Sequence, residues 1–358
     1  MANGSEPGST PDDALGQEFI HYVGNASPIL TACCERSSRA EWVAENADCR
    51  LEKHALSAWR RTLQLSSVSQ VKASINSVIS LRYFRPTSLD AALRLIAEAS
   101  AVTVAGGTAL NISKVDRHSG KRIVDLGNLH DSRRIFRGEQ HWRISTMTTW
   151  SDLLEASDLP SHFEGLKEAA RQIGSLQIQN MGTICGNLCR ASAVSDGIPN
   201  LLTMNALVEL RTVIGFRHLS VNDFLVGDNA TVLGADELVV GVIIPDPIRP
   251  ARSGFVKISA RKQFSVSILN VAAALEMNAD LTIGAARIAV GGFTPSAVRL
   301  RRLEDCLLGC QIGDQVQAVM DDMYLGGLDL ADDRRAAAAY RRDTLQSVLG
   351  RLVVGLCQ

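Results

Sequence analysis

The sequence has no excess of charge of either sign and no hydrophobic run long enough to cross a membrane. Its 37 Lys and Arg residues balance 38 Asp and Glu residues, for a formal net charge of −1. A chain with this charge balance has no strong positive electrostatic potential to attract an anionic polymer, which argues against a nucleic acid partner. Apolar runs such as residues 238–245 have the length of a strand, whereas a bilayer span needs roughly 20 residues. The N-terminus lacks the pattern of a secretion signal, so we expect a soluble, cytoplasmic protein without a membrane partner.

Motifs for structural metal sites, nucleotide hydrolysis and nucleophilic catalysis are also missing. The eight cysteines include no C-x-x-C pair and complete no zinc site, so we expect free thiols in a reducing compartment. Neither G-x-G-x-x-G nor the P-loop G-x-x-x-x-G-K-[ST] occurs, which argues against a Rossmann nicotinamide site and an NTPase. A G-x-S-x-G elbow and an H-E-x-x-H helix are absent as well. If the chain takes part in catalysis, a bound cofactor supplies the difficult chemistry.

Strands and helices alternate along the part of the chain that follows residue 81. The length of 358 residues and the hydrophobic content of 46% suffice for more than one core, because single cores stop growing at roughly 250–300 residues. Periodicity predicts helices over residues 89–99, capped by Thr87 or Ser88, and over residues 166–173. A further helix begins within residues 148–153. The expected strands cover residues 101–105, 122–126, 141–145, 207–211 and 237–244, and the alternation favours α/β layers.

Changes of composition divide the chain into four parts. Residues 1–13 are rich in Gly, Ser, Pro and Asp and predict a disordered tail, whereas residues 14–80 have a helical pattern. The first folded domain is expected over residues 81–247 and ends where Pro245, Pro247 and Pro250 interrupt the pattern. A second domain is expected over residues 253–356. Its strands are predicted at residues 254–259, 268–276 and 286–292, and its helices at 299–308 and 334–354.

Two glycine-containing segments are the most informative local features. Val104-Ala105-Gly106-Gly107-Thr108 would let backbone N–H groups approach a phosphate, and residues 180–187, interpreted as a loop, offer a second such cradle. A single Gly-Gly-Thr is more often an ordinary turn. Two such segments, separated by about 75 residues, favour a ligand held between two subdomains. Asp196 follows the second segment and is either part of that site or the cap of a helix.

The order of the motifs resembles that of a known family. Residues 82–89 precede the first glycine segment, and residues 121–126, 148–153, 179–188, 196–199 and 237–240 follow it. This set resembles the FAD-binding domain of molybdenum hydroxylases, of the type found in bacterial xanthine dehydrogenase and in CO dehydrogenase flavoproteins. Residues 257–259, 287–292 and 340–342 resemble the C-terminal domain of the same family, so the resemblance covers about residues 81–355.

The resemblance implies an α+β architecture. It consists of a two-subdomain FAD-binding fold of the vanillyl-alcohol-oxidase and CO-dehydrogenase-flavoprotein type. A smaller α+β domain with a three-stranded sheet and helices follows it. FAD is the implied cofactor, and no catalytic or metal-binding residue is implied on this chain.

The resemblance also assigns the phosphate end of the cofactor site. Residues 103–110 would wrap the FAD pyrophosphate, and Thr183, Gly186 and Asn187 would bind from the opposite side. The individual residues of the first segment are Thr103, Val104, Ala105, Gly106, Gly107, Thr108, Ala109 and Leu110.

At the flavin end the resemblance assigns four further residues. Asp196 would lie beside the flavin ring and Lys257 would contact it. Ile173 and Val239 would supply apolar contacts.

The implied function is electron transfer within a xanthine-dehydrogenase-like molybdenum hydroxylase of purine catabolism. The flavin would accept electrons from iron–sulfur clusters on a partner chain and pass them to NAD or another acceptor, while the molybdenum cofactor lies on a different chain. Residues 14–80 would be the remnant of an iron–sulfur domain. Because no set of four cysteines can be assembled there, we expect no iron–sulfur cluster and no molybdenum cofactor on this chain.

Departures from the family pattern leave a second interpretation open. Cys185 stands where the family has glycine, Ala109 stands where it has aspartate, and residues 264–267 replace an acidic run. A side chain is costly if position 185 needs a positive φ. The chain could therefore be a degenerate, non-catalytic relative that keeps the fold but has lost the cofactor or clusters. A free-standing flavin reductase or oxidase is a third interpretation, with Asp196 as the one visible acid–base candidate.

Overall fold

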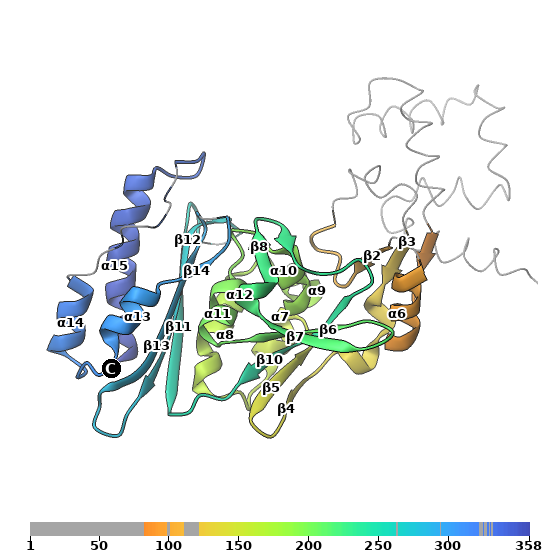
Figure 1. The fold of residues 1–358 in the computed structure, drawn as a ribbon. Helices are drawn as coiled ribbons and strands as arrows, with labels where there is room; N and C mark the ends of the chain where they lie inside the picture. The colour runs from red at the N-terminus through yellow and green to blue at the C-terminus, as the bar shows by residue number, and fades with distance from the viewer. Residues whose placement is uncertain are drawn as a thin grey trace, which may run out of the picture. The chain divides into compact units, whose positions relative to one another are not determined.

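The computed structural model describes residues 82–98, 101–110, 122–262, 264–293, 295–321, 325, 328, 330 and 332–358. The chain divides into two compact units, Met1–Ile79 and Ser80–Gln358, and the described residues all belong to the second. The expectations for residues 1–13 and 14–80 therefore lie outside the described residues. Figure 1 shows the arrangement of the elements in the second unit.

A small parallel sheet begins the described part. It has the order β1-β3-β2, formed by β1 (Arg82–Phe84), β2 (Ala101–Val104) and β3 (Arg122–Asp125). Helix α6 (Leu89–Glu98) connects β1 to β2, as the sequence predicted, and the Ser88 hydroxyl accepts a hydrogen bond from the N–H of Ala91 at 3.3 Å. Its buried face joins Leu238 and Val240 of the next sheet in one core.

The second sheet is antiparallel and has the order β4-β5-β10-β6-β7. Its strands are β4 (Ile135–Arg137), β5 (His141–Ser145), β10 (Leu238–Pro245), β6 (Leu207–Arg211) and β7 (Phe216–Ser220). The central strand β10 is almost fully buried, because its run of Val and Ile packs between neighbours on both sides. Two short strands, β8 (Leu225–Gly227) and β9 (Ala230–Thr231), pair beyond the helix α12 (Val221–Phe224).

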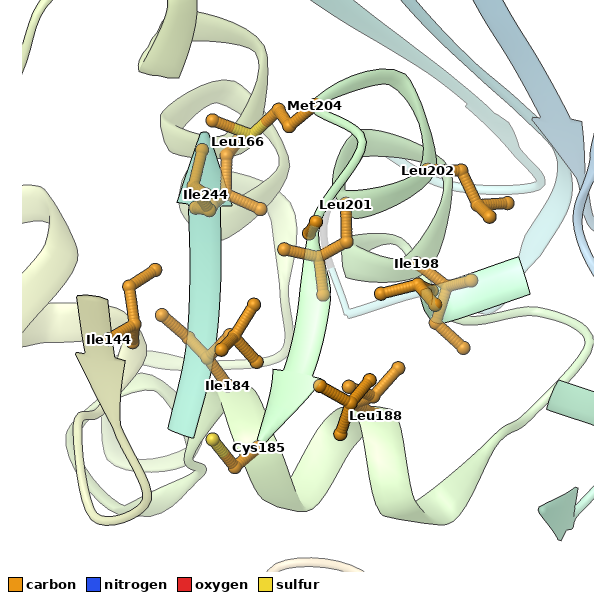
Figure 2. Close-up of a cluster of buried hydrophobic side chains, with 14 of the residues drawn as sticks. Ile144, Leu166, Ile184, Cys185, Leu188, Ile198, Leu201, Leu202, Met204 and Ile244 are labelled. Carbon is orange, nitrogen blue, oxygen red and sulfur yellow. The ribbon is translucent and has the colours of Figure 1, made fainter. Parts of the chain in front are cut away.

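Helices lie in the segment between β5 and β6, and most of them complete the core of this sheet. They are α7 (Trp150–Glu155), α8 (Glu164–Gln172), α9 (Leu176–Met181), α10 (Ile184–Arg190) and α11 (Gly197–Thr203). Figure 2 shows part of the core, where Ile184 and Leu188 of α10 gather with Ile198 and Leu201 of α11. Residues 180–187 were expected to form a loop, and this prediction was wrong. Apart from Gly182 and Thr183 they belong to α9 and α10, two helices too short to show a helical period.

The C-terminal part is an antiparallel sheet with the order β11-β12-β13-β14. The three predicted strands are present as β11 (Ala251–Ser259), β12 (Ser267–Met277) and β13 (Ile283–Gly291), and the two-residue β14 (Val298–Arg299) adds a fourth to the expected three. Three helices pack against this sheet and form a second hydrophobic core with it: α13 (Arg301–Leu307), α14 (Asp314–Asp321) and α15 (Ala338–Leu356). Figure 1 shows them on the outer side, while α8 and α11 contact the sheet from the other side.

No helix in the described ranges is long and apolar enough to cross a membrane. The same residues contain no group of three His, Cys, Asp or Glu side chains arranged to hold a metal ion.

Candidate functional site

The first glycine segment forms a tight turn after β2. Gly107 has a φ of +67°, which glycine adopts without the strain of a Cβ, and the N–H of Leu110 closes the turn on the Gly107 carbonyl at 3.0 Å. Thr103, Gly107, Thr108 and Ala109 are exposed. Within the described part of the chain, the N–H groups of Gly106, Gly107 and Thr108 donate to no other residue. Backbone donors of this kind in a tight turn are suited to binding a phosphate.

The second segment lies where α9 meets α10. Thr183 is 3% exposed and caps α10, because its hydroxyl accepts the N–H of Gly186 at 3.0 Å. A Cβ on Gly186 would lie 2.7 Å from that hydroxyl, so glycine preserves the cap. Thr183 also pairs with Thr149 in an isolated bridge, with the N–H of Ile184 donating to the Thr148 carbonyl at 3.0 Å. Packing on both sides thus fixes this segment.

The two glycine segments lie against one another. A Cβ on Gly106 would lie 1.6 Å from the carbonyl oxygen of Met181, so the backbones touch at a distance that only glycine permits. The Thr108 hydroxyl oxygen lies 3.4 Å from the position that a Cβ on Gly182 would take. The contact between the two segments therefore brings together exposed backbone donors, a hydroxyl group and small residues. These groups fit the pyrophosphate of a dinucleotide cofactor.

Asp196 and Lys257 form a buried ion pair. The Lys257 ammonium lies 2.6 Å from Oδ2 of Asp196, and each side chain is 7% exposed. Oδ1 of Asp196 accepts the Ser267 hydroxyl at 2.6 Å and the Asn270 amide at 2.9 Å. These bonds offset the cost of burying both charges.

The position of Asp196 at the start of α11 raised the alternative that it caps this helix. Its side chain makes no capping hydrogen bond, because it turns toward Lys257 instead. Asp196 thus holds the cap position of α11 without capping the helix through its side chain.

Asn187 connects α10 to the turn that carries Asp196. Its Oδ1 accepts the hydroxyl of Ser195 at 2.6 Å, and the Ser195 carbonyl accepts the amide of Asn270 at 3.0 Å. A Cβ on Gly197 would lie 2.9 Å from Oδ1 of Asn187 and would disturb this contact. Hydrogen bonds thus connect the start of α10 to the turn before α11. Four of the predicted residues lie in this region: Thr183, Gly186, Asn187 and Asp196.

The structure does not bring every predicted residue to this surface. Val239 is 1% exposed in β10 and belongs to the main core, and Ile173 is half-buried against the same core. Val239 therefore lies inside the protein, whereas Ile173 keeps part of its surface exposed. Ser267 and Asn270 were missed. Their signal is two polar side chains in the otherwise apolar start of β12.

Cys185 does not strain the backbone. It is absent from the non-glycine residues with positive φ in the described chain, and it lies in the first turn of α10. Its side chain is 1% exposed, and Figure 2 shows it in the core near Ile184. Burial raises the pKa of the thiol, which keeps it protonated and inert. The expected cost of a side chain at position 185 therefore does not arise.

Two glycine segments in contact that offer backbone donors favour a flavoprotein of the dinucleotide-binding class. Comparisons with known families agree. The FAD binding domain in molybdopterin dehydrogenase matches residues 77–247, and the CO dehydrogenase flavoprotein C-terminal domain matches residues 254–355. This chain belongs to the FAD-binding flavoprotein family of the molybdenum hydroxylases, which are oxidoreductases.

Individual relatives agree with this assignment. The chain is 29% identical to the nicotine 6-hydroxylase medium subunit of Paenarthrobacter nicotinovorans, over 77% of this chain and 96% of the relative. It is 26% identical to the xanthine dehydrogenase FAD-binding subunit of Escherichia coli O157:H7, over 76% and 94%. The structure of quinoline 2-oxidoreductase from Pseudomonas putida 86 superposes with a TM-score of 0.70 at 24% identity, covering 78% of this chain and 97% of that chain, and shows the same fold.

Proposed function

We propose that this chain is the FAD-binding electron-transfer subunit of a xanthine-dehydrogenase-like molybdenum hydroxylase of purine catabolism. Partner chains carry the molybdenum cofactor and the iron–sulfur clusters. When bound, FAD supplies the exchange of electrons between those clusters and NAD or another acceptor. This chain binds the cofactor and orients it.

The close approach of Gly106 to Met181 carries the FAD-binding part of this proposal. It joins residues 103–110 to residues 182–187 with no side chain between the two backbones. In this proposal, backbone N–H groups of the first segment bind the pyrophosphate. The position of the Thr108 hydroxyl beside Gly182 supports it. At the proposed flavin end Lys257 would supply a positive charge, and its ion pair with Asp196, which holds the ammonium in place, supports this role.

Titration of the purified full chain with FAD tests cofactor binding, and the quenching of the flavin fluorescence is the signal that is measured. We expect stoichiometric binding in the wild type. Replacement of Thr108 by Glu places a negative charge beside the pyrophosphate and weakens binding by about tenfold or more, since about 1.4 kcal/mol corresponds to a factor of ten. Val213→Glu, at a position 52% exposed on the β6–β7 turn, is the matched control and leaves binding unchanged. Failure of the wild type to bind saturating FAD would favour the degenerate relative.

Mixing the FAD-loaded chain with NADH tests the acceptor. Because electron transfer to NAD is reversible, NADH is expected to bleach the visible flavin band. A band that persists at excess NADH contradicts the assignment of NAD and favours another acceptor.

A further inference from the structure

A cluster of charged residues before and within α15 reaches the start of β12. Arg335 donates from Nη1 to the Ser267 carbonyl at 2.8 Å, and Arg341 donates from Nε to the Ile268 carbonyl at 3.3 Å. Both guanidinium groups also bind Asp333, Arg335 to Oδ2 at 2.5 Å and Arg341 to Oδ1 at 2.6 Å. One carboxylate thus holds two arginines against consecutive residues of the strand.

The cluster is built for rigidity. Arg341 is fully buried, at 0% exposure, and donates to Asp333 and to the carbonyls of Ile268 and Ala336. Desolvation opposes the charge on Asp333, but hydrogen bonds from Arg335 and Arg341 outweigh it and lower the pKa of this carboxyl. Asp333 therefore stays ionised, and the planar arginine groups keep several bonds at fixed angles.

The pairing of β11 with β12 does not by itself fix the position of Ser267, the residue whose carbonyl accepts from Arg335. Ser267 pairs with Ser259 at the end of the β11–β12 ladder, directly after a shift of register between Ile258 and Ser259. Such an irregularity loosens the geometry imposed by the ladder. Phe264, three residues before Ser267, has a φ of +51°, which is unfavourable for a residue with a side chain. The hydrogen bonds from Arg335 and Arg341 therefore hold the backbone of residues 267 and 268 in place where the ladder is irregular.

Ser267 links this cluster to the cofactor site. Its hydroxyl donates to Oδ1 of Asp196 at 2.6 Å, and Oδ2 of Asp196 holds Lys257 at 2.6 Å. We propose that Asp333, Arg335 and Arg341 are positioning residues of the cofactor site, which act through Ser267 to fix the Asp196–Lys257 pair. The consequence for FAD rests on the proposed function, whereas the geometry of the pair does not.

The experiment compares the full-length variants Arg335→Gln, Ser267→Ala and the double variant in a thermodynamic cycle. Arg335 is suitable because its side chain is 25% exposed, so its loss leaves the core intact. Arg342→Gln is the control, since Arg342 is exposed next to Arg341. Two quantities are measured. The first is the dissociation constant of FAD. The second is the rate at which an acylating reagent modifies Lys257 in the absence of FAD, and peptide mass spectrometry quantifies this modification.

We expect each single variant to weaken FAD binding by about fivefold, the effect of one lost hydrogen bond, and to accelerate acylation of Lys257. The double variant is expected to resemble Ser267→Ala, and Arg342→Gln to resemble the wild type. Wild-type values for Arg335→Gln, or effects that multiply in the double variant, would overturn the proposal. If the wild type binds no FAD but Arg335→Gln still exposes Lys257, the positioning role stands and the proposed function fails.

Discussion

The ammonium of Lys257 lies 2.6 Å from the carboxylate of Asp196 although 61 residues separate them in the chain. A buried pair of this kind costs much when one partner is removed, because the other charge stays buried without compensation. We therefore expect Lys257→Met to lower the free energy of unfolding by about 3 kcal/mol, and the double change with Asp196→Asn to recover part of that loss. Urea denaturation measures both.

The control for this prediction is an exposed pair. Arg171 and Glu164 lie 2.7 Å apart with 53% and 47% of their side chains exposed. Solvent screens such a pair, so Arg171→Gln is expected to change stability by less than about 1 kcal/mol. Equal losses for Lys257→Met and Arg171→Gln would contradict the view that burial sets the cost.

The contact between Gly106 and Met181 gives a second prediction. A Cβ at Gly106 would lie 1.6 Å from a backbone oxygen, which cannot move as a flexible side chain could. Gly106→Ala is therefore expected to separate the two glycine segments, to destabilise the chain by about 2 kcal/mol and to weaken FAD binding by about tenfold or more. Gly215→Ala, where nothing lies within 4 Å of the added Cβ, is the matched change and leaves both quantities unaltered. Unchanged FAD affinity in Gly106→Ala would show that the contact is irrelevant to the cofactor.

Most of the long elements could be predicted from the sequence because their signals are local. The strand expected at 237–244 is β10 (Leu238–Pro245), since a run of Val and Ile ends at Pro245. The strand over residues 141–145 coincides with β5. Helix α9 could not be predicted in this way, because none of its residues is buried and it shows no apolar face. Its hydrogen bonds and tertiary contacts, rather than a hydrophobic pattern, define it.

The candidate site could be predicted in part for the same reason. Gly106 and Gly107 carry the local signal of a tight turn, whereas Thr183 was assigned through the family resemblance and its role as a helix cap was not predicted. The roles of Ser267 and Asn270 depend on strand β12 lying against the turn at Asp196, which is more than 70 residues away in the chain. Only the three-dimensional arrangement shows such a contact.

Cys185 gives a third prediction, in which restoring the glycine of the family pattern does harm. The thiol is buried in the core, and its Sγ lies 3.9 Å from the Ser145 carbonyl. Cys185→Gly removes this packing and places glycine in the first turn of α10, so we expect a loss of about 2 kcal/mol in the free energy of unfolding. FAD affinity is expected to stay at the wild-type value, because the side chain belongs to the core. Tighter FAD binding in this variant would mean that Cys185 obstructs the site.

His162 gives a prediction for the dependence of stability on pH. It is 8% exposed in the turn before α8. Desolvation lowers its pKa, the charges of Arg137 and Arg287 lower it further, and those of Asp246 and Glu276 oppose this. The ordinary pKa of histidine is about 6.5, so the unfolded chain binds a proton below that pH while the folded chain resists it. The stability supplied by neutral His162 is therefore fully present above about pH 6.5 and is lost as the pH falls toward the folded pKa.

Urea denaturation at about pH 7.5 and about pH 5.5, on either side of the ordinary pKa, measures this effect in wild type and in His162→Gln. The wild type is expected to lose more stability between the two conditions than the variant, since only the wild type must pay for protonating a buried ring. His218→Gln is the control, because His218 is an exposed histidine on β7, and the loss of stability of this variant between the two conditions is compared with that of the wild type. A wild-type loss no greater than that of His162→Gln would mean that other groups set the acid sensitivity of the fold.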